Sequence, residues 1–155
     1  MFYGEYHHSL DSKERAIVPS RFREIFKDNY SEKLFITRGL DKCLFLFTEE
    51  DWKNQEKKFR SHSFTSADSR RFNRLLFSGA VEVALDRQGR ILIPNYLKKF
   101  AEIKQDVVII GASDRIEIWS KDEWKKFYDS SVGTYEEVAE RLFNKEPNQN
   151  IGGEV

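Results

Sequence analysis

The segment LDSKERAIVPSRFREIF at residues 10–26 is repeated as LDRQGRILIPNYLKKFA at residues 85–101. A constant offset of 75 residues aligns leucine, aspartate, arginine and proline in the same order, namely Leu10, Asp11, Arg15 and Pro19 with Leu85, Asp86, Arg90 and Pro94. A second likeness, at an offset of 72, relates residues 34–53 to residues 106–125. Repetition of this kind indicates two copies of one structural unit of about 45 residues.

Each copy has the same order of expected elements. In the second copy, Val81, Val83 and Leu85 alternate before a polar turn, and the next apolar strand ends at Pro94, which cannot donate to a strand ladder. Helical spacing follows the proline, and residues 107–119 then favour a hairpin that leads into a short helix. The sequence therefore predicts a β-β-α-β-β repeat, followed by a short helix, in each half of the chain.

The two copies are expected to fold together. Four short strands with few apolar residues cannot close a core alone. The sequence thus predicts one β-rich α+β unit in which two tandem repeats pair about a pseudo-two-fold axis. The predicted divisions are a first repeat, a basic helical linker, a second repeat, a C-terminal helix and a disordered tail, at residues 5–52, 53–80, 81–124, 132–144 and 145–155.

The segments outside the repeats differ in charge. Residues 53–80 carry a net charge of +5, whereas residues 132–155 carry −3. Phe72, Leu75 and Leu76 recur at helical spacing and predict a linker helix over residues 67–77. The final residues have too little apolar content to bury, which predicts disorder.

Composition excludes several classes of protein. The 26 basic residues are balanced by 26 acidic ones, so the chain lacks the general positive charge of many nucleic-acid-binding proteins. No apolar run approaches the roughly 20 residues of a membrane span, and the N-terminus has no secretory pattern. The single cysteine, Cys43, excludes an intrachain disulfide. We therefore expect a cytoplasmic protein without a membrane partner.

Residues that typically carry catalysis are sparse. His7, His8 and His62 are too few and too clustered for most metal or catalytic sites, and no phosphate-binding loop, zinc motif or nucleophile elbow is present. Cys43 lies among apolar residues, which favours a buried structural thiol. The sequence predicts no enzyme, no metal or other cofactor, no small-molecule substrate and no ligand pocket.

The repeated Asp-x-x-x-Arg turn is the candidate binding site in this sequence. We call residues 11–15 the first tip and residues 86–90 the second tip. The tips carry four cationic side chains, namely Lys13, Arg15, Arg87 and Arg90. Arginine makes forked contacts with phosphate and with the guanine edge, and the aspartate can order its own turn or orient the arginine. One such turn is most simply a solvated loop, but repetition at equivalent positions favours DNA binding.

The chain resembles the bacterial MraZ family over residues 1–143. The resemblance rests on the doubled Asp-x-x-x-Arg motif together with MFYGEYHHSLD at the N-terminus, the linker RRFNRLLFSGAVEVALD and the segment RIEIWSKDEW. It implies membership of the AbrB/SpoVT- and MazE-like superfamily, in which a swapped-hairpin β-barrel binds double-stranded DNA. Two copies in one chain would form that barrel internally.

The resemblance also implies a function. MraZ proteins are nucleoid-associated transcriptional regulators, generally repressors of their own division and cell-wall operon, that bind short direct promoter repeats with a TGGG core. They form homo-oligomeric rings of eight or twelve subunits, so weak tips would add up through effective concentration. The motif residues carry over onto Asp11 and Arg15 and onto Asp86 and Arg90.

The expected roles divide by residue type. Arg15 and Arg90 are the candidates for contacts with base edges, and Lys13 and Arg87 for contacts with phosphate. The aspartates would orient the arginines. The six residues predicted to form the DNA-binding site are Asp11, Lys13, Arg15, Asp86, Arg87 and Arg90.

One position departs from the family pattern. Glu14 in the first copy stands where the family, and Gly89 in the second copy, have glycine. Glycine there indicates a positive φ or a close backbone approach. Glutamate either tolerates the turn with some strain or changes it. Alternatively, Glu14 pairs with Lys13 and lowers the affinity for DNA.

Other interpretations remain open. The basic residues of the linker helix, Arg70, Arg71 and Arg74, either line DNA or accompany a helix used for packing and subunit contacts, and their apolar neighbours favour packing. The chain could also be an antitoxin-like module whose partner is a toxin, although it lacks a long extended C-terminal arm. A hydrolase that uses Asp11 and Asp86 is a third, weaker alternative.

Overall fold

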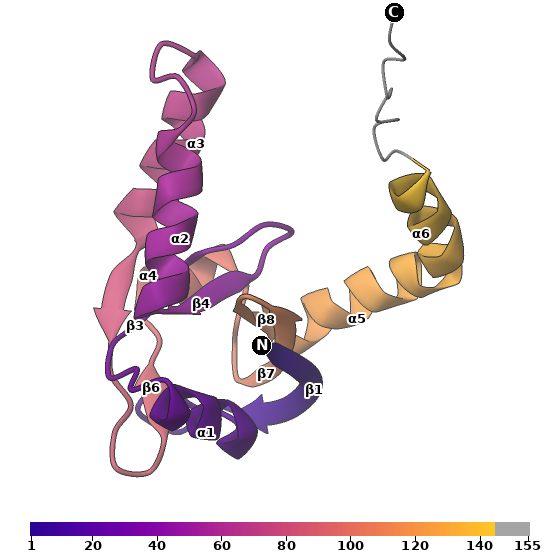
Figure 1. Cartoon of the computed structure of the whole chain (residues 1–155). Helices are drawn as coiled ribbons and strands as arrows, with labels where there is room; N and C mark the ends of the chain where they lie inside the picture. The colour runs from indigo at the N-terminus through magenta and orange to yellow at the C-terminus, as the bar shows by residue number, and fades with distance from the viewer. Residues whose placement is uncertain (145–155) are drawn as a thin grey trace, which may run out of the picture. The chain divides into compact units, whose positions relative to one another are not determined.

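The computed structural model describes residues 1–144, in which each repeat has the same order of elements (Figure 1). The chain divides into two compact units, Met1–Trp124 and Lys125–Val155. The first repeat contains β1 (Phe2–Ser9), β2 (Arg15–Ile17), α1 (Ser20–Asp28), β3 (Leu34–Arg38), β4 (Leu44–Thr48) and α2 (Glu49–Arg60). After α3 (Ala67–Gly79), the second repeat contains β5 (Val81–Val83), β6 (Arg90–Leu92), α4 (Asn95–Phe100), β7 (Asp106–Ser113), β8 (Ile116–Ser120) and α5 (Lys121–Ser131).

The strands of the two repeats are interleaved. Strand β1 pairs with β7, β5 with β3, β4 with β8 and β2 with β6, all antiparallel, so most ladders join one repeat to the other. In the β2–β6 ladder Ala16 lies opposite Ile91, and in the β4–β8 ladder Phe45 lies opposite Glu117. Each of these pairs consists of one residue and its own repeat equivalent. The registers therefore confirm the predicted pseudo-two-fold pairing of the repeats.

The predicted swapped-hairpin pairing is present, but the strands do not close into a continuous barrel. The strands form an open six-stranded sheet in the order β1-β7-β8-β4-β3-β5 and a separate two-stranded ladder, β2-β6. Pro19 and Pro94 follow β2 and β6 directly, and because proline lacks an N–H it ends these strands after three residues. Strands this short do not extend the larger sheet into a continuous ring of hydrogen bonds.

The larger of two buried hydrophobic clusters joins both repeats. It contains Ala16, Val18 and Phe22 of the first repeat together with Ile91 and Leu97 of the second, each 2% exposed or less. Burial of an aliphatic or aromatic side chain of this size contributes about 1.5–3 kcal/mol. Because neither repeat supplies this core alone, the two repeats stabilise each other.

Helix α2, at the end of the first repeat, and helix α3, which follows it, form a helical hairpin (Figure 1). Helix α3 confirms the predicted linker helix, but α2 continues to Arg60 and is longer than the predicted short helix. Thr48 caps α2 by accepting a hydrogen bond from the Asp51 N–H at 3.2 Å. The Phe59 ring packs edge-on against the Phe72 ring, with centroids 5.0 Å apart. Because many residues of α2 are charged, its apolar contacts produce no clear helical periodicity in the sequence.

The second unit is helical in its described part. It contains the remainder of α5, the short 3₁₀ helix η1 (Val132–Thr134) and α6 (Tyr135–Phe143), which confirms the predicted C-terminal helix. The predicted disordered tail at residues 145–155 lies outside the described residues. None of the described helices combines the length and the apolar character that a membrane span needs.

Candidate nucleic-acid interface

The first tip is ordered by the carboxylate of Asp11. Its Oδ1 accepts hydrogen bonds from the backbone N–H of Lys13 at 2.9 Å and of Arg15 at 3.0 Å. The Glu14 N–H donates to the Asp11 carbonyl, and the Asp11 N–H donates to the Arg15 carbonyl, both at 3.0 Å. The aspartate thus closes the turn through its side chain and its backbone together.

The second tip repeats this pattern. Oδ1 of Asp86 accepts from the backbone N–H of Gln88 and of Arg90, both at 2.9 Å. The Gly89 N–H donates to the Asp86 carbonyl at 3.0 Å, and the Asp86 N–H donates to the Arg90 carbonyl at 2.9 Å. The sequence repetition is therefore a repetition of hydrogen-bond geometry as well.

The two tips meet in a crossed quartet of side chains, which we define as Asp11, Arg15, Asp86 and Arg90. Within each tip, the arginine Nε donates to the aspartate Oδ2 at 2.8 Å. Between the tips, Arg90 Nη1 donates to Asp11 Oδ2 at 3.3 Å, and Arg15 Nη1 lies 3.7 Å from Asp86 Oδ2. The four side chains are between 23% and 32% exposed. Each arginine therefore has a defined orientation and a partly accessible guanidinium.

The quartet also keeps both carboxylates ionised. Partial desolvation raises the pKa of Asp11, but hydrogen bonds from Arg15 and Lys13 outweigh it, so this pKa lies below its ordinary value of 3.8. The hydrogen bond from the Arg90 backbone is the largest influence on Asp86, and the pKa of Asp86 is lowered as well. A carboxylate with a lowered pKa is a poor general acid at neutral pH, which argues against the hydrolase alternative.

The other predicted cations lie at the surface of the tips. Lys13 and Arg87 are exposed, and neither forms an ion pair with any residue in the described range 1–144. They do not occupy equivalent positions, because Lys13 aligns with Gln88 and Arg87 aligns with Ser12. The structure thus brings the four predicted cations to one end of the paired repeats, with two held in the quartet and two extended beside it.

Glu14 adopts the left-handed backbone conformation, as does the equivalent Gly89 in the second copy. Its φ is 63°, and the φ of Gly89 is 77°. The turn is therefore preserved rather than changed. The proposed pairing of Glu14 with Lys13 is wrong, because the Glu14 carboxylate instead binds the ammonium of Lys98 on α4.

Each tip is anchored to the opposite repeat. The Val18 N–H donates to the Gly89 carbonyl at 2.9 Å, and the Ile93 N–H donates to the Glu14 carbonyl at 3.3 Å. Lys98, and Arg23 at the aligned position of the first repeat, were not among the predicted site residues. Their only sequence signal is the 75-residue offset, which places a cation at the same position of α1 and α4.

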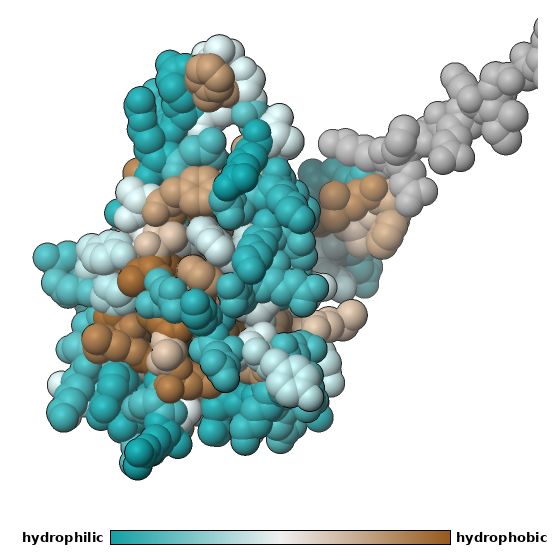
Figure 2. All heavy atoms as spheres, turned by 60° about the vertical axis from the view of Figure 1, so that its left-hand side comes forward, coloured by the Kyte–Doolittle hydropathy of each residue, from teal (hydrophilic) through white to brown (hydrophobic). Residues whose placement is uncertain are grey.

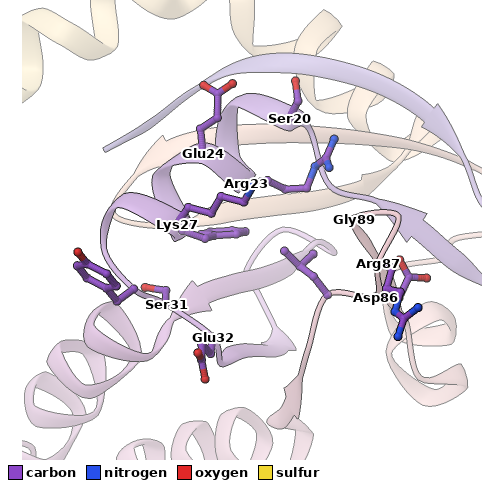
Figure 3. A pocket seen from close by; sticks show the side chains of 12 residues that line it. Ser20, Arg23, Glu24, Lys27, Ser31, Glu32, Asp86, Arg87 and Gly89 are labelled. Atoms are coloured by element: carbon purple, nitrogen blue, oxygen red, sulfur yellow. The ribbon is translucent and has the colours of Figure 1, made fainter.

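A groove runs between α1 and the second tip (Figure 3). Its volume is about 610 Å³. Its charged lining residues have both signs, namely Arg23, Lys27 and Arg87 with Glu24, Glu32 and Asp86. The prediction that the chain has no pocket did not anticipate this groove, because its two walls come from segments some 60 residues apart. Figure 3 shows the Arg23 side chain extending toward Gly89.

The other residues considered for chemistry have structural roles. Cys43 is fully buried, as predicted, and burial raises the pKa of its thiol, which donates to the Leu40 carbonyl at 3.0 Å. Within the range 1–144, no group of three or more histidine, cysteine, aspartate or glutamate side chains is arranged to hold a metal ion. In α3, Arg70 donates to the carbonyls of Phe64 and Thr65 and so stabilises its own helix start.

Two consecutive segments of the chain match one family model. The model describes the MraZ protein as antitoxin-like, and it matches residues 1–75 and residues 76–146. The two matches correspond to the two structural repeats and cover nearly the whole chain. The chain belongs to the MraZ family.

Proposed function

We propose that this protein is a sequence-specific DNA-binding transcriptional regulator whose two tips contact the duplex. The observation that carries the proposal is the crossed quartet. It holds Arg15 and Arg90 in matched orientations at one end of the paired repeats, with exposed Lys13 and Arg87 beside them. Preorganised arginines lose little side-chain entropy when they meet a planar acceptor.

The geometry suggests a division of roles among these cations. The Nε and Nη1 atoms of Arg15 and Arg90 are engaged with the aspartates, and Nη2 makes no hydrogen bond within residues 1–144. Nη2 is therefore available for a base edge or a phosphate oxygen. Lys13 and Arg87, which are exposed and unpaired in the same range, suit phosphate contacts that give affinity without sequence preference.

Oligomerisation would explain how a chain with zero net charge binds DNA through this site. Because the net charge is zero, a single subunit offers little general attraction to a polyanion. Several subunits in a ring of eight or twelve would place many tips on successive promoter repeats and raise the effective concentration of each. Figure 2 shows hydrophobic surface gathered on one face of the molecule, as is common at subunit interfaces. Four large hydrophobic residues of β2, β6 and α4, namely Ile17, Leu92, Tyr96 and Phe100, are each at least 37% exposed.

The regulator that we propose acts on its own promoter. It would repress the division and cell-wall operon that begins with its own gene, through short direct repeats, and would associate with the nucleoid. A gel shift against the DNA upstream of this gene tests the proposal, with wild type beside Arg90→Ala across a salt series. Binding that weakens steeply with salt and is lost in Arg90→Ala supports it. The absence of any shift at low salt overturns it.

An antitoxin-like interaction is the second candidate. The family description favours it. Helix α6 is suited to a protein partner because Tyr135, Leu142 and Phe143 are 66–76% exposed and Glu136 and Glu137 lie in its first turn. Co-purification of a small nuclease with the full chain, lost in Leu142→Asp, would support this candidate. DNA binding that needs no such partner would favour the regulator.

A further inference from the structure

Besides the unmatched positions of Lys13 and Arg87, the two tips differ where the first has Glu14 and the second has Gly89. The 75-residue offset aligns Glu14 with Gly89 and Lys98 with Arg23. At the first tip, Glu14 binds Lys98, whose side chain is only 12% exposed. At the second tip, Gly89 has no side chain to offer Arg23. The pseudo-two-fold axis therefore relates an ion pair on one side to a cation that forms no ion pair within residues 1–144 on the other.

The packing around Gly89 shows why the cation stays there. A Cβ at position 89 would lie 2.6 Å from Arg23 Cδ and 2.7 Å from Arg23 Nη1, so the arginine fills the space that a side chain would need. Arg23 Nε donates to the Val18 carbonyl at 3.0 Å, which fixes the guanidinium beside the tip. No carboxylate of residues 1–144 lies within ion-pair distance of Arg23. Arg23 lines the groove between α1 and the second tip, whose lining also includes Lys27, Glu24 and Glu32 (Figure 3).

The local charge of the tips is consequently unequal. With Lys98 included, the first tip carries three cations and two carboxylates, Asp11 and Glu14. With Arg23 included, the second tip carries three cations and one carboxylate, Asp86. Moreover, the first tip's additional cation is nearly buried in its ion pair. Only the second tip keeps its additional cation unpaired at the edge of the groove.

We propose that Arg23 is an additional phosphate-binding residue of the second tip, and that the Glu14–Lys98 pair withholds the equivalent cation at the first tip. This inference rests on the proposed DNA-binding function. It has a structural consequence, because two equal tips related by a pseudo-two-fold axis would bind a duplex equally well in either direction. Unequal tips give each subunit a polarity on the DNA.

The test is the salt dependence of binding to the upstream promoter fragment, followed by fluorescence anisotropy of the labelled duplex. Each phosphate contact adds about 0.9 to the slope of log K against log salt concentration. Arg23→Ala is expected to lower the slope by about this amount for each engaged second tip. Glu14→Gln keeps the size of the side chain, releases Lys98 and is expected to raise affinity and steepen the slope.

The matched control is Arg21→Ala. Arg21 lies on the same helix and carries the same charge, but its Nη1 donates to the Tyr3 hydroxyl at 3.2 Å and it does not line the groove. It is expected to leave the slope close to that of wild type. Thermal unfolding of every variant checks that the fold is retained, and Glu14→Gln supplies an independent test should Arg23→Ala fail to fold.

The outcomes separate the two proposals. If Arg23→Ala and Glu14→Gln both keep the wild-type slope while Arg90→Ala loses binding, the inequality of the tips is wrong and the DNA-binding function stands. An equal effect of Arg21→Ala and Arg23→Ala also overturns the inference, because it would reflect general charge. If wild type binds no promoter DNA, both proposals fall.

Discussion

Arg90 of the second repeat donates a hydrogen bond from Nη1 to Oδ2 of Asp11 in the first repeat, 3.3 Å away. The two residues are 79 positions apart in the chain, and the reciprocal pair, Arg15 and Asp86, lies at 3.7 Å. Each motif arginine thus holds its own turn and the turn of the other repeat. The quartet is at once a structural contact between repeats and the base of the proposed DNA-binding surface.

This contact predicts energetic coupling between the repeats. A double-mutant cycle of Asp11→Ala and Arg90→Ala, measured by denaturant unfolding, is expected to give a coupling energy of about 0.5–1 kcal/mol, because the pair is partly exposed and charge-assisted. The control cycle of Lys125→Ala and Asp129→Ala uses a pair whose side chains are 76% and 59% exposed, and it is expected to give less. Additive effects of Asp11→Ala and Arg90→Ala would contradict the coupling.

The lowered pKa values of Asp11 and Asp86 predict a loss of stability in acid. A carboxylate whose pKa is lower in the folded state stabilises the fold above its unfolded-state value, here 3.8, and this stabilisation is lost as pH falls through the folded-state pKa. Wild type should therefore lose stability as pH falls below about 4. The double variant Asp11→Asn/Asp86→Asn should show a shallower decline in thermal melts over this range. Equal declines would show that the quartet makes no contribution.

The roles of the tip cations predict two kinds of binding defect. Arg90→Ala should cost about 1–3 kcal/mol per engaged tip and reduce the preference for promoter DNA over a scrambled duplex. Arg87→Ala should weaken binding to both duplexes alike, since a phosphate contact carries no sequence information. Competition binding with the two duplexes measures this difference. If Arg90→Ala kept the wild-type preference for promoter DNA, the proposed contact between Arg90 and a base edge would be wrong.

Close packing of β1 on β7 predicts a stability defect far from the tips. A Cβ at Gly111 would lie 2.2 Å from the Tyr3 backbone nitrogen, so Gly111→Ala must displace one of the paired strands. We expect a loss of about 1–3 kcal/mol or more in the free energy of unfolding. Gly133→Ala is the matched control, because a Cβ there meets nothing within 4 Å. Similar melting temperatures for the two variants would contradict this account of the β1–β7 ladder.

The repeats could be predicted because the 75-residue offset aligns the same residues twice, and their pairing because one copy has too few apolar residues to close a core. The strands and turns within each repeat could be predicted because their signals are local. These signals are the alternating valines, the strand-ending prolines and the Asp-x-x-x-Arg spacing. The strand order of the open sheet could not be predicted, because pairs such as Phe2 with Ser113 join segments that are far apart in the chain. Helix α2 was underestimated because its aromatic contacts, such as Phe59 with Phe72, involve a helix that follows it.

The candidate site was predicted in its composition but not in its connections. The four tip cations and both aspartates follow from the motif. The crossing of Arg90 to Asp11, and the approach of Lys98 and Arg23 to opposite tips, depend on tertiary packing between repeats. For Glu14 the sequence left two alternatives, a preserved or a changed turn, because glutamate rarely adopts a positive φ; the surrounding hydrogen bonds preserve the turn.

The most direct test of the central claim is the affinity for upstream promoter DNA measured by fluorescence anisotropy for wild type and for Arg15→Ala/Arg90→Ala, each checked for a retained melting transition. The account predicts that wild type binds this fragment more tightly than a scrambled duplex and that the folded double variant loses the difference. Equal promoter affinity of wild type and the double variant would contradict it.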